Sequence, residues 1–223
     1  ARHEDIINVE RVICLIIGYA FGLFQTAFIY GKLHGIDIRE HGSGNAGTTN
    51  TLRVLGTKAG LIVLAGDIIK CILAIVISGL ILGVSHPDEI YLLKLYAAAG
   101  AILGHNFPFY LHFRGGKGIA ATAGLILSFH IAFLPMGVII FFGTFFLTHY
   151  VSLGSLLVYA GLMIEMVVAG QAGLFGASQA VLNEMYIVTA LLTILAYYKH
   201  RENIGRLLKG TERKTYLTKK NKE

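Results

Sequence analysis

Hydrophobic positions in this chain form long uninterrupted runs rather than an alternation of apolar and polar residues. An apolar run of about 20 residues is long enough for a helix to cross the hydrocarbon core of a bilayer. The runs therefore predict an all-α integral membrane protein built as a seven-transmembrane-helix bundle. The fourth and fifth runs are short, so a single tilted helix or a re-entrant pair would reduce the count to six or five. The predicted spans are 12–31, 59–84, 90–110, 119–135, 136–148, 152–170 and 184–198.

The amino-acid composition also indicates a membrane protein. Hydrophobic residues make up 55% of the chain and charged residues only 14%, whereas an average soluble domain is about 25% charged. The formal charge of +6 would suggest nucleic acid as a partner of a soluble protein. In a membrane chain the cations first set orientation, and we expect no nucleic-acid partner. Cys14 and Cys71 both lie inside apolar runs, so a disulfide framework is not expected.

The distribution of basic residues predicts the orientation of the bundle. Seven spans place the two termini on opposite sides of the membrane. Fifteen of the 19 lysines and arginines then lie in segments on the side of the C-terminus, three lie on the other side, and Lys70 lies within a span. Because basic residues concentrate in cytoplasmic segments, we expect the N-terminus outside and the C-terminus in the cytoplasm. Residues 1–212 are predicted to form the membrane-embedded domain and residues 213–223 a basic cytoplasmic tail.

The same orientation collects the glycine-rich, polar and basic loops on the cytoplasmic side. These loops are 34–58, 105–118 and the segment that begins at His200. Loops that only connected spans would have no reason to segregate in this way. These three segments are therefore the candidates for chemistry.

The first segment reads HGSGNAGTTN over 41–50 and is followed by Arg53. Its glycine spacing matches the dinucleotide-binding fingerprint, but that fingerprint requires a strand before it and a βαβ unit around it, and here apolar spans lie on both sides. Glycines that let backbone N–H groups approach an anion remain, and Ser43, Thr49 and Asn50 add hydroxyl and amide groups. A flexible connector is the alternative interpretation.

The second segment, 104–118, ends in Gly115-Gly116-Lys117-Gly118 and leads into an apolar run. It lacks the first glycine and the final Ser or Thr of a Walker A loop. It still combines backbone N–H groups, a helix N-terminus and a cation, which favours a phosphate ligand. Basic residues that only anchor a span at the interface are the alternative.

The third segment contains His200, Asn203 and Arg206. His200 and Asn203 are three residues apart, so they are neighbours on one helical face. Both can hydrogen-bond a hydroxyl group, and a histidine can move a proton near neutral pH. A basic surface helix is the alternative interpretation.

Ionisable residues inside the predicted spans leave a second class of function open. Asp67 and Lys70 are three residues apart and can pair, and Glu165 lies deeper in the sixth span. A transporter or channel for an organic phosphate would use such charges, although the chain has no internal repeat to support it. No HExxH, CxxC or acidic pair indicates a metal site, so we expect no metal and no cofactor.

Four ordered stretches resemble the bacterial membrane glycerol-3-phosphate acyltransferases that use acyl phosphate as the donor, the PlsY family. One departure is Cys71, which stands where glycine is expected. The matching stretches are 43–50 with Arg53, 66–70, 104–118 and 200–207.

The resemblance implies a seven-helix bundle with a cytoplasm-facing active site in the bacterial cytoplasmic membrane. It implies acyl transfer from acyl phosphate to the 1-hydroxyl of glycerol 3-phosphate, the first step of phospholipid synthesis. The products would be 1-acyl-glycerol 3-phosphate, or lysophosphatidate, and phosphate. A single bundle surrounded by membrane lipid would suffice, so a monomer is expected.

The resemblance also implies roles for individual residues. Ser43, Lys117, His200 and Asn203 are expected to be catalytic. Either His200 or a phosphate oxygen of the donor would accept the proton of the attacking hydroxyl, and the sequence leaves both open. The expected substrate- and phosphate-binding residues are Gly44, Asn45, Thr49, Asn50, Arg53, Lys70, His105, Gly115, Gly116, Gly118 and Arg206.

Overall fold

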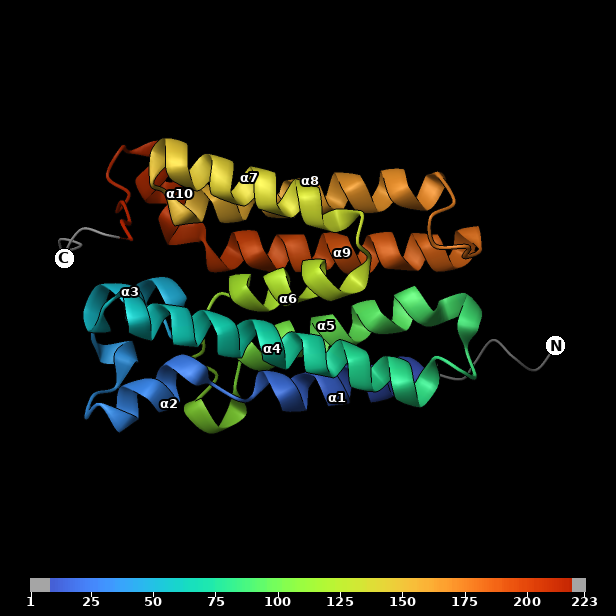
Figure 1. Ribbon diagram of the computed structural model, residues 1–223, viewed down its shortest axis with the longest axis horizontal. Helices are drawn as coiled ribbons and strands as arrows, with labels where there is room; N and C mark the ends of the chain where they lie inside the picture. Colours follow the sequence, from blue (N-terminus) through green and yellow to red (C-terminus); the bar gives the residue numbers. More distant parts are fainter. Residues whose placement is uncertain (1–8, 218–223) are drawn as a thin grey trace.

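The computed structural model describes residues 9–217, and helices are the regular secondary structure of this part of the chain (Figure 1). Helices α1 to α6 form one side of an elongated bundle, and α7 to α10 form the other side. Helix α5 is packed between α1, α4, α6 and α9. The helices are α1 (Val9–Gly22), α2 (Thr26–Leu33), α3 (Thr48–Leu55), α4 (Thr57–Leu82), α5 (Ile90–Asn106), α6 (Ile119–Phe129), α7 (Phe133–Thr148), α8 (Val151–Gln171), α9 (Gln179–Lys199) and α10 (Arg201–Leu208).

The first predicted span, 12–31, is interrupted rather than continuous. The chain leaves the helix after Gly22 and begins α2 at Thr26. At the break, the amide nitrogen of buried Gln25 donates to the carbonyl oxygens of Gly22 (3.1 Å), Gly104 (3.1 Å) and His105 (3.2 Å). These bonds satisfy backbone groups that the break and the end of α5 leave without helical partners.

Helices α1 and α5 cross with their backbones in contact. A Cβ atom on Gly18 or Gly22 would overlap a carbonyl oxygen of α5, and one on Gly100 or Gly104 would overlap a carbonyl oxygen of α1. Only glycine permits this approach, and small residues of this kind are typical of helix contacts in membranes. The crossing fixes the break at Gln25 beside the end of α5.

The remaining spans agree with the hydropathy pattern, with shifts at their ends. The predicted spans 59–84 and 152–170 are confirmed as α4 and α8. Helix α5 ends at Asn106, four residues short of the predicted 110, and α9 begins at Gln179, five residues before the predicted 184.

The predicted turn at Pro135 is wrong, because the chain turns at 130–132. Pro135 instead lies in the first turn of α7, where the missing N–H removes no helical hydrogen bond. Helices α6 and α7 are separate, which excludes the single tilted helix as their structure.

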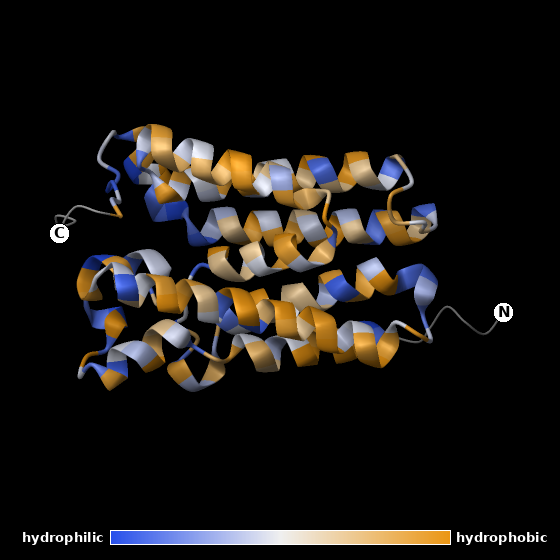
Figure 2. Cartoon of the chain, in the orientation of Figure 1, coloured by the Kyte–Doolittle hydropathy of each residue, from blue (hydrophilic) through white to orange (hydrophobic). Residues whose placement is uncertain are grey.

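Four helical segments of the described chain are long and apolar enough to cross a membrane. They are 9–33, 57–82, 151–171 and 179–199, and α6 and α7 are shorter apolar helices. Orange, apolar residues predominate along the helices in the middle of the bundle, whereas blue, hydrophilic residues gather towards its ends (Figure 2). The count of seven spans and the orientation of the termini stay predictions.

The three polar segments lie at one end of the bundle. This end carries α2, α3, α10 and the last described residues (left in Figure 1), and the opposite end carries the start of α1 and the α4–α5 and α8–α9 turns. The topology therefore places the loops that sequence analysis singled out on a common side of the molecule.

The described part of the predicted tail folds back onto this end. Arg53 donates to the Thr215 hydroxyl (2.7 Å) and to the Arg213 carbonyl (3.3 Å), and the Thr215 N–H donates to the His149 carbonyl (2.9 Å). Thr57 donates to the carbonyl of Leu217 (2.9 Å). Residues 213–217 are thus attached to the bundle, and the basic residues 219, 220 and 222 lie outside the described residues.

Candidate active site

The two glycine-rich loops are in contact with each other. The N–H of Gly116 donates to the carbonyl of His105 (3.1 Å), which folds the second loop back along the end of α5. A Cβ atom on Gly116 would overlap the His105 imidazole and would come within 2.7 Å of the Ala46 carbonyl oxygen of the first loop. Gly115 is equally restricted by the His105 carbonyl, and Gly118 has a φ of 82°. These positions require glycine because backbone and ring occupy the space of a side chain.

An ion pair in the first loop provides a second connection between the loops. The Arg39 guanidinium pairs with Asp37 (2.7 Å) and donates to the Leu111 carbonyl of the second loop (3.2 Å). The hydrogen bond from the Arg39 side chain lowers the pKa of Asp37 to about 2, so the pair is charged at neutral pH. Sequence analysis did not single out this pair, because a charge pair two residues apart has no distinctive pattern.

Asn50 holds the first loop in shape. Its buried amide donates to the carbonyls of His41 (2.9 Å) and Ile38 (3.1 Å), and its oxygen accepts from the Ser43 N–H (2.8 Å). The amide is therefore committed to backbone groups, while the Ser43 side chain is exposed at the tip of the loop. Gly44 supports this tip with a φ of 71°.

The other expected residues of this loop surround the N-terminus of α3. Asn45 and Thr49 are partly exposed, and the backbone of Gly47 to Thr49 begins the helix. The first N–H groups of a helix lack intrahelical partners and attract anions. The Thr48 hydroxyl is buried there with no hydrogen-bond partner among the described residues.

The second and third segments meet through Lys117. Its ammonium donates to the side-chain oxygen of Asn203, and the Asn203 amide donates to Glu212 (3.0 Å). Arg206 approaches the same Glu212 carboxylate (3.5 Å). Burial, and secondarily the charge of Arg206, lowers the pKa of Lys117 to about 8. Lys117 reaches Glu212 only through Asn203, and Arg206 also lies 4.0 Å from the exposed carboxylate of Glu202. Two cations and two carboxylates therefore lie together where the segments meet.

His200 is a buried neutral imidazole at the junction of α9 and α10. Its Nδ1 lies 2.8 Å from the carbonyl oxygen of Ala196, so Nδ1 carries the proton and Nε2 keeps a lone pair. Burial is the main cause that lowers the pKa of His200 to about 4, and the nearby Lys117 lowers it further. The ring can accept a hydrogen bond at neutral pH, but it is a weak base.

Arg53 points from α3 towards the folded-back tail. Burial, and next the charge of Arg213, lowers the pKa of the Arg53 guanidinium. One of its nitrogens, Nε, is buried and has no partner among the described residues. An anion beside Arg53 would supply the missing acceptor.

Lys70 and His105 lie beneath the loops rather than at their rim. The Lys70 ammonium contacts the Phe24 carbonyl (2.8 Å), the Nδ1 of His105 (2.8 Å) and Asp67 (2.9 Å), and these three contacts use all its donors. Thr26 donates to the same Asp67 oxygen (3.2 Å). The expected pairing of Asp67 with Lys70 is confirmed. The helix break adds the Phe24 carbonyl as a further partner of Lys70.

Glu165 and the question of a metal site complete the features noted in the sequence. One carboxylate oxygen of Glu165 in α8 is buried without a hydrogen-bond partner among the described residues. Within residues 9–217, no group of three or more His, Cys, Asp or Glu side chains is arranged to hold a metal ion.

A helical bundle with helices long and apolar enough to cross a membrane, and with cationic, glycine-rich loops at one end, defines a membrane protein with a candidate anion-binding site. The chain belongs to the glycerol-3-phosphate acyltransferase family, whose model matches residues 12–210. This membership confirms the resemblance noted from the four ordered stretches.

Relatives and solved structures agree with this family. The chain is 38% identical to glycerol-3-phosphate acyltransferase 2 of Bacillus cereus over 96% of this chain and 100% of the relative. It is 40% identical to the Bacillus cytotoxicus enzyme over 93% of this chain and 96% of the relative. The crystal structure of PlsY, an integral membrane glycerol 3-phosphate acyltransferase in its glycerol 3-phosphate form, superimposes with a TM-score of 0.78 at 29% identity, covering 92% of this chain and 96% of that one. The lysophosphatidic acid form of PlsY gives a TM-score of 0.75 at 28% identity, covering 92% and 94%.

Proposed function

We propose that this acyltransferase uses acyl phosphate as its donor and acylates the 1-hydroxyl of glycerol 3-phosphate. The hydroxyl oxygen would bond to the acyl carbon, the bond from that carbon to the phosphate oxygen would break, and the hydroxyl proton would pass to phosphate. The products are lysophosphatidate and inorganic phosphate. The single observation that supports the proposal is that the three polar segments meet, through Lys117 on Asn203 and through the contact between the two glycine loops.

The donor is already activated, so the protein needs to position two phosphates and stabilise charge rather than form a covalent intermediate. We assign phosphate binding to Lys117, Arg53, Arg206 and the N–H groups that begin α3. The N–H groups of Gly44, Gly115 and Gly116 are bonded to backbone carbonyls, so these glycines would shape the loops rather than donate to phosphate. Ser43 and Thr49 would contact substrate from the first loop, and Asn203 would orient glycerol 3-phosphate. Asn50, Lys70 and His105 would act as positioning residues, because their polar groups are committed to the protein.

The buried His200 favours the donor phosphate as the base. An imidazole with a pKa of about 4 has little affinity for a proton at neutral pH. Its free Nε2 can instead accept the hydrogen bond of the attacking hydroxyl and align it. The proton would then move to a phosphate oxygen of the donor as the carbon–oxygen bond forms.

We further propose the orientation that the basic residues predict. The glycine loops would face the cytoplasm, where glycerol 3-phosphate is dissolved, and the acyl chain of the donor would remain in the membrane. The bundle would span the bacterial cytoplasmic membrane seven times and act as a monomer, with 213–223 as its cytoplasmic tail.

A direct assay tests the proposed reaction. Purified protein in detergent receives acyl phosphate and glycerol 3-phosphate, and phosphate release is followed with each substrate omitted in turn. Release that requires both substrates, with formation of lysophosphatidate, is expected. An organic-phosphate transporter would instead move glycerol 3-phosphate across liposomes without acyl transfer, and that result would overturn the proposal.

Replacing His200 by asparagine should leave most of the maximal rate. The asparagine keeps a polar side chain at the site but cannot act as an imidazole base. Because burial has lowered the pKa of His200 to about 4, the wild-type enzyme should also lack a histidine limb near pH 6.5 in its kcat profile. Rates of both enzymes from pH 5 to 9 provide the measurement. Loss of nearly all activity in a folded variant, together with a wild-type limb near pH 6.5, would identify His200 as the base.

Excess chelator should leave acyl transfer unchanged. The proposed site stabilises phosphate with cations of the protein, so no divalent ion is needed for charge stabilisation. The measurement compares phosphate release with and without EDTA. A complete loss that only Mg²⁺ restores would show that a metal ion takes part.

A further inference from the structure

A pocket of about 520 Å³ opens between α4, α5 and α6 at the end of the bundle away from the catalytic loops. Apolar side chains form most of its wall, from Ile75 in α4 to Ile90 at the start of α5. No candidate site residue lines this pocket, and its nearest wall residue in α4, Ile75, follows Lys70 by five residues, or about 7.5 Å along the helix axis. The pocket is therefore distinct from the proposed reaction centre.

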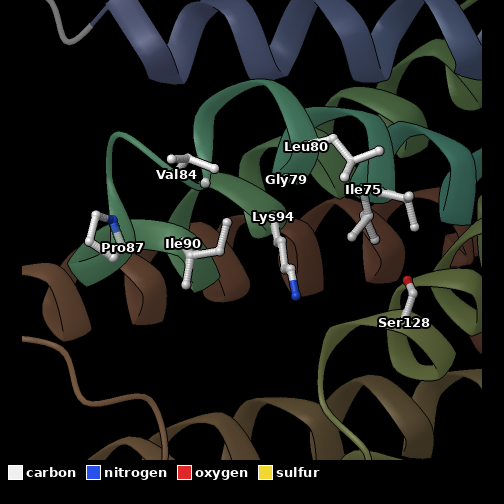
Figure 3. Close-up of a pocket in the computed structure, with 10 residues that line it drawn as sticks. Ile75, Gly79, Leu80, Val84, Pro87, Ile90, Lys94 and Ser128 are labelled. Carbon is white, nitrogen blue, oxygen red and sulfur yellow. The ribbon is translucent and has the colours of Figure 1, made fainter.

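One cation enters this apolar pocket. Figure 3 shows the Lys94 side chain extending from α5 into the pocket, with Ser128 of α6 across from it. The ammonium lies 5.3 Å from the centre of the Tyr91 ring. Ser128 already donates its hydroxyl to the Gly124 carbonyl (2.6 Å), so it does not compete for a further acceptor.

Lys94 has no carboxylate partner among the described residues, although carboxylates are present at this end of the bundle. Glu89 and Glu184 both bind Arg11 (3.2 and 2.6 Å), and Glu10 pairs with His86 (3.4 Å). These three acids are therefore engaged elsewhere, and the fourth acid at this end, exposed Asp88, makes no ion pair with Lys94. The described residues thus supply no counter-charge to the Lys94 ammonium.

The position of the pocket indicates where that anion comes from. The wall residues Leu80 and Val84 are 74% and 92% exposed, so the pocket opens sideways onto the apolar surface of the bundle. Lys94 follows the start of α5 by four residues, or about 6 Å along the helix axis. A lysine at this depth reaches the headgroup region of a bilayer, while the apolar wall continues below it.

From this charge complementarity we infer that the pocket binds an anionic phospholipid of the membrane, with its phosphate at Lys94 and an acyl chain along the apolar wall of α4. Such a lipid enters laterally and need not leave the hydrocarbon. The inference does not depend on the acyl donor proposed above, because no catalytic residue takes part.

A tryptophan reporter makes the test specific to this pocket, since the chain contains no tryptophan. Val84→Trp places the reporter at the rim, and Val168→Trp on α8 at the same end of the bundle, 62% exposed, provides the matched control. Both proteins are placed in nanodiscs, and brominated phosphatidylglycerol or brominated phosphatidylcholine is added as the quencher. The anionic lipid should quench Val84→Trp at about a fivefold lower mole fraction than the zwitterionic lipid, and Val168→Trp should show no preference.

Two variants in the Val84→Trp background distinguish the contribution of the lipid headgroup to binding from that of the acyl chain. Lys94→Gln should abolish the fivefold preference, whereas Lys58→Gln, an exposed lysine at the other end of α4, should retain it. Gly79→Leu keeps the charge of Lys94 but fills the pocket. The substitution is sterically allowed, because a Cβ atom at residue 79 would lie 3.8 Å from the Lys94 side chain without overlap. This variant should reduce quenching by both lipids.

Three outcomes would overturn the inference. They are equal quenching of Val84→Trp by the two lipids, an unchanged preference in Lys94→Gln, and relief of quenching by inorganic phosphate. The last result would show that a soluble anion, rather than a lipid, occupies Lys94. Should Lys94→Gln fail to fold, unchanged quenching in Gly79→Leu would by itself contradict the inference.

Discussion

Replacing Lys117 by alanine is expected to lower kcat by about 10²- to 10³-fold, the range for losing one preorganised group that stabilises developing charge. Lys117 is the cation that joins the second glycine loop to Asn203, and burial strengthens its interaction with a phosphate. Steady-state rates with both substrates provide the measurement. The loss should appear mainly in kcat, because negative charge develops on the departing phosphate as its bond to the acyl carbon breaks, so the interaction is stronger in the transition state than in the ground state.

Two controls accompany this variant. Lys209→Ala removes an exposed lysine at the end of α10 and should retain wild-type activity. Lys117→Arg keeps the positive charge and should recover part of the lost rate, although its planar group cannot reproduce the contact of an ammonium. Size-exclusion profiles and thermal unfolding show whether each variant is folded. Near-normal turnover of a folded Lys117→Ala enzyme would remove Lys117 from the centre of the site.

Replacing Lys70 by methionine is expected to lower the free energy of unfolding by about 3–5 kcal/mol, because the buried Asp67 carboxylate loses its counter-charge. The Phe24 carbonyl at the helix break would also lose its donor. The double variant Asp67→Leu with Lys70→Met removes both charges and should regain most of the lost stability. Denaturation in detergent, followed by circular dichroism, measures these differences.

The same variants separate a positioning role from direct phosphate binding. A positioning role predicts that stability and activity fall together in Lys70→Met, since the break and the end of α5 support the loops to which we assign catalysis. If Lys70→Met unfolded like the wild type but showed a raised KM for glycerol 3-phosphate, Lys70 would contact the substrate directly.

The sequence was sufficient to predict the long spans and the convergence of the loops. Spans such as 59–84 and 152–170 depend on hydrophobicity and length alone, and these properties are local. The meeting of loops 41–50, 104–118 and the segment from His200 follows from their common side, which the positions of the basic residues already indicate.

Features that depend on contacts between distant segments could not be predicted. The apolar run 12–31 contains no proline or charge to mark its break, and the break becomes intelligible only with Gln25 between two backbones and Lys70 on the Phe24 carbonyl. Asn50 offers the same amide whether it faces substrate or backbone, so its pattern could not reveal that it shapes the loop. Pro135 suggested a turn, yet a first helical turn accepts proline equally well.

The glycine contact between α1 and α5 has a consequence for how the enzyme responds to its surroundings. Two helices that touch backbone to backbone are held by dispersion forces and close fit, which operate in lipid and detergent alike. The contact between α1 and α5 thus fixes the distance, along the bundle axis, between the helix break and the end of α5. Membranes of different thickness should change the tilt of the whole bundle, while the spacing of the phosphate-holding groups stays constant.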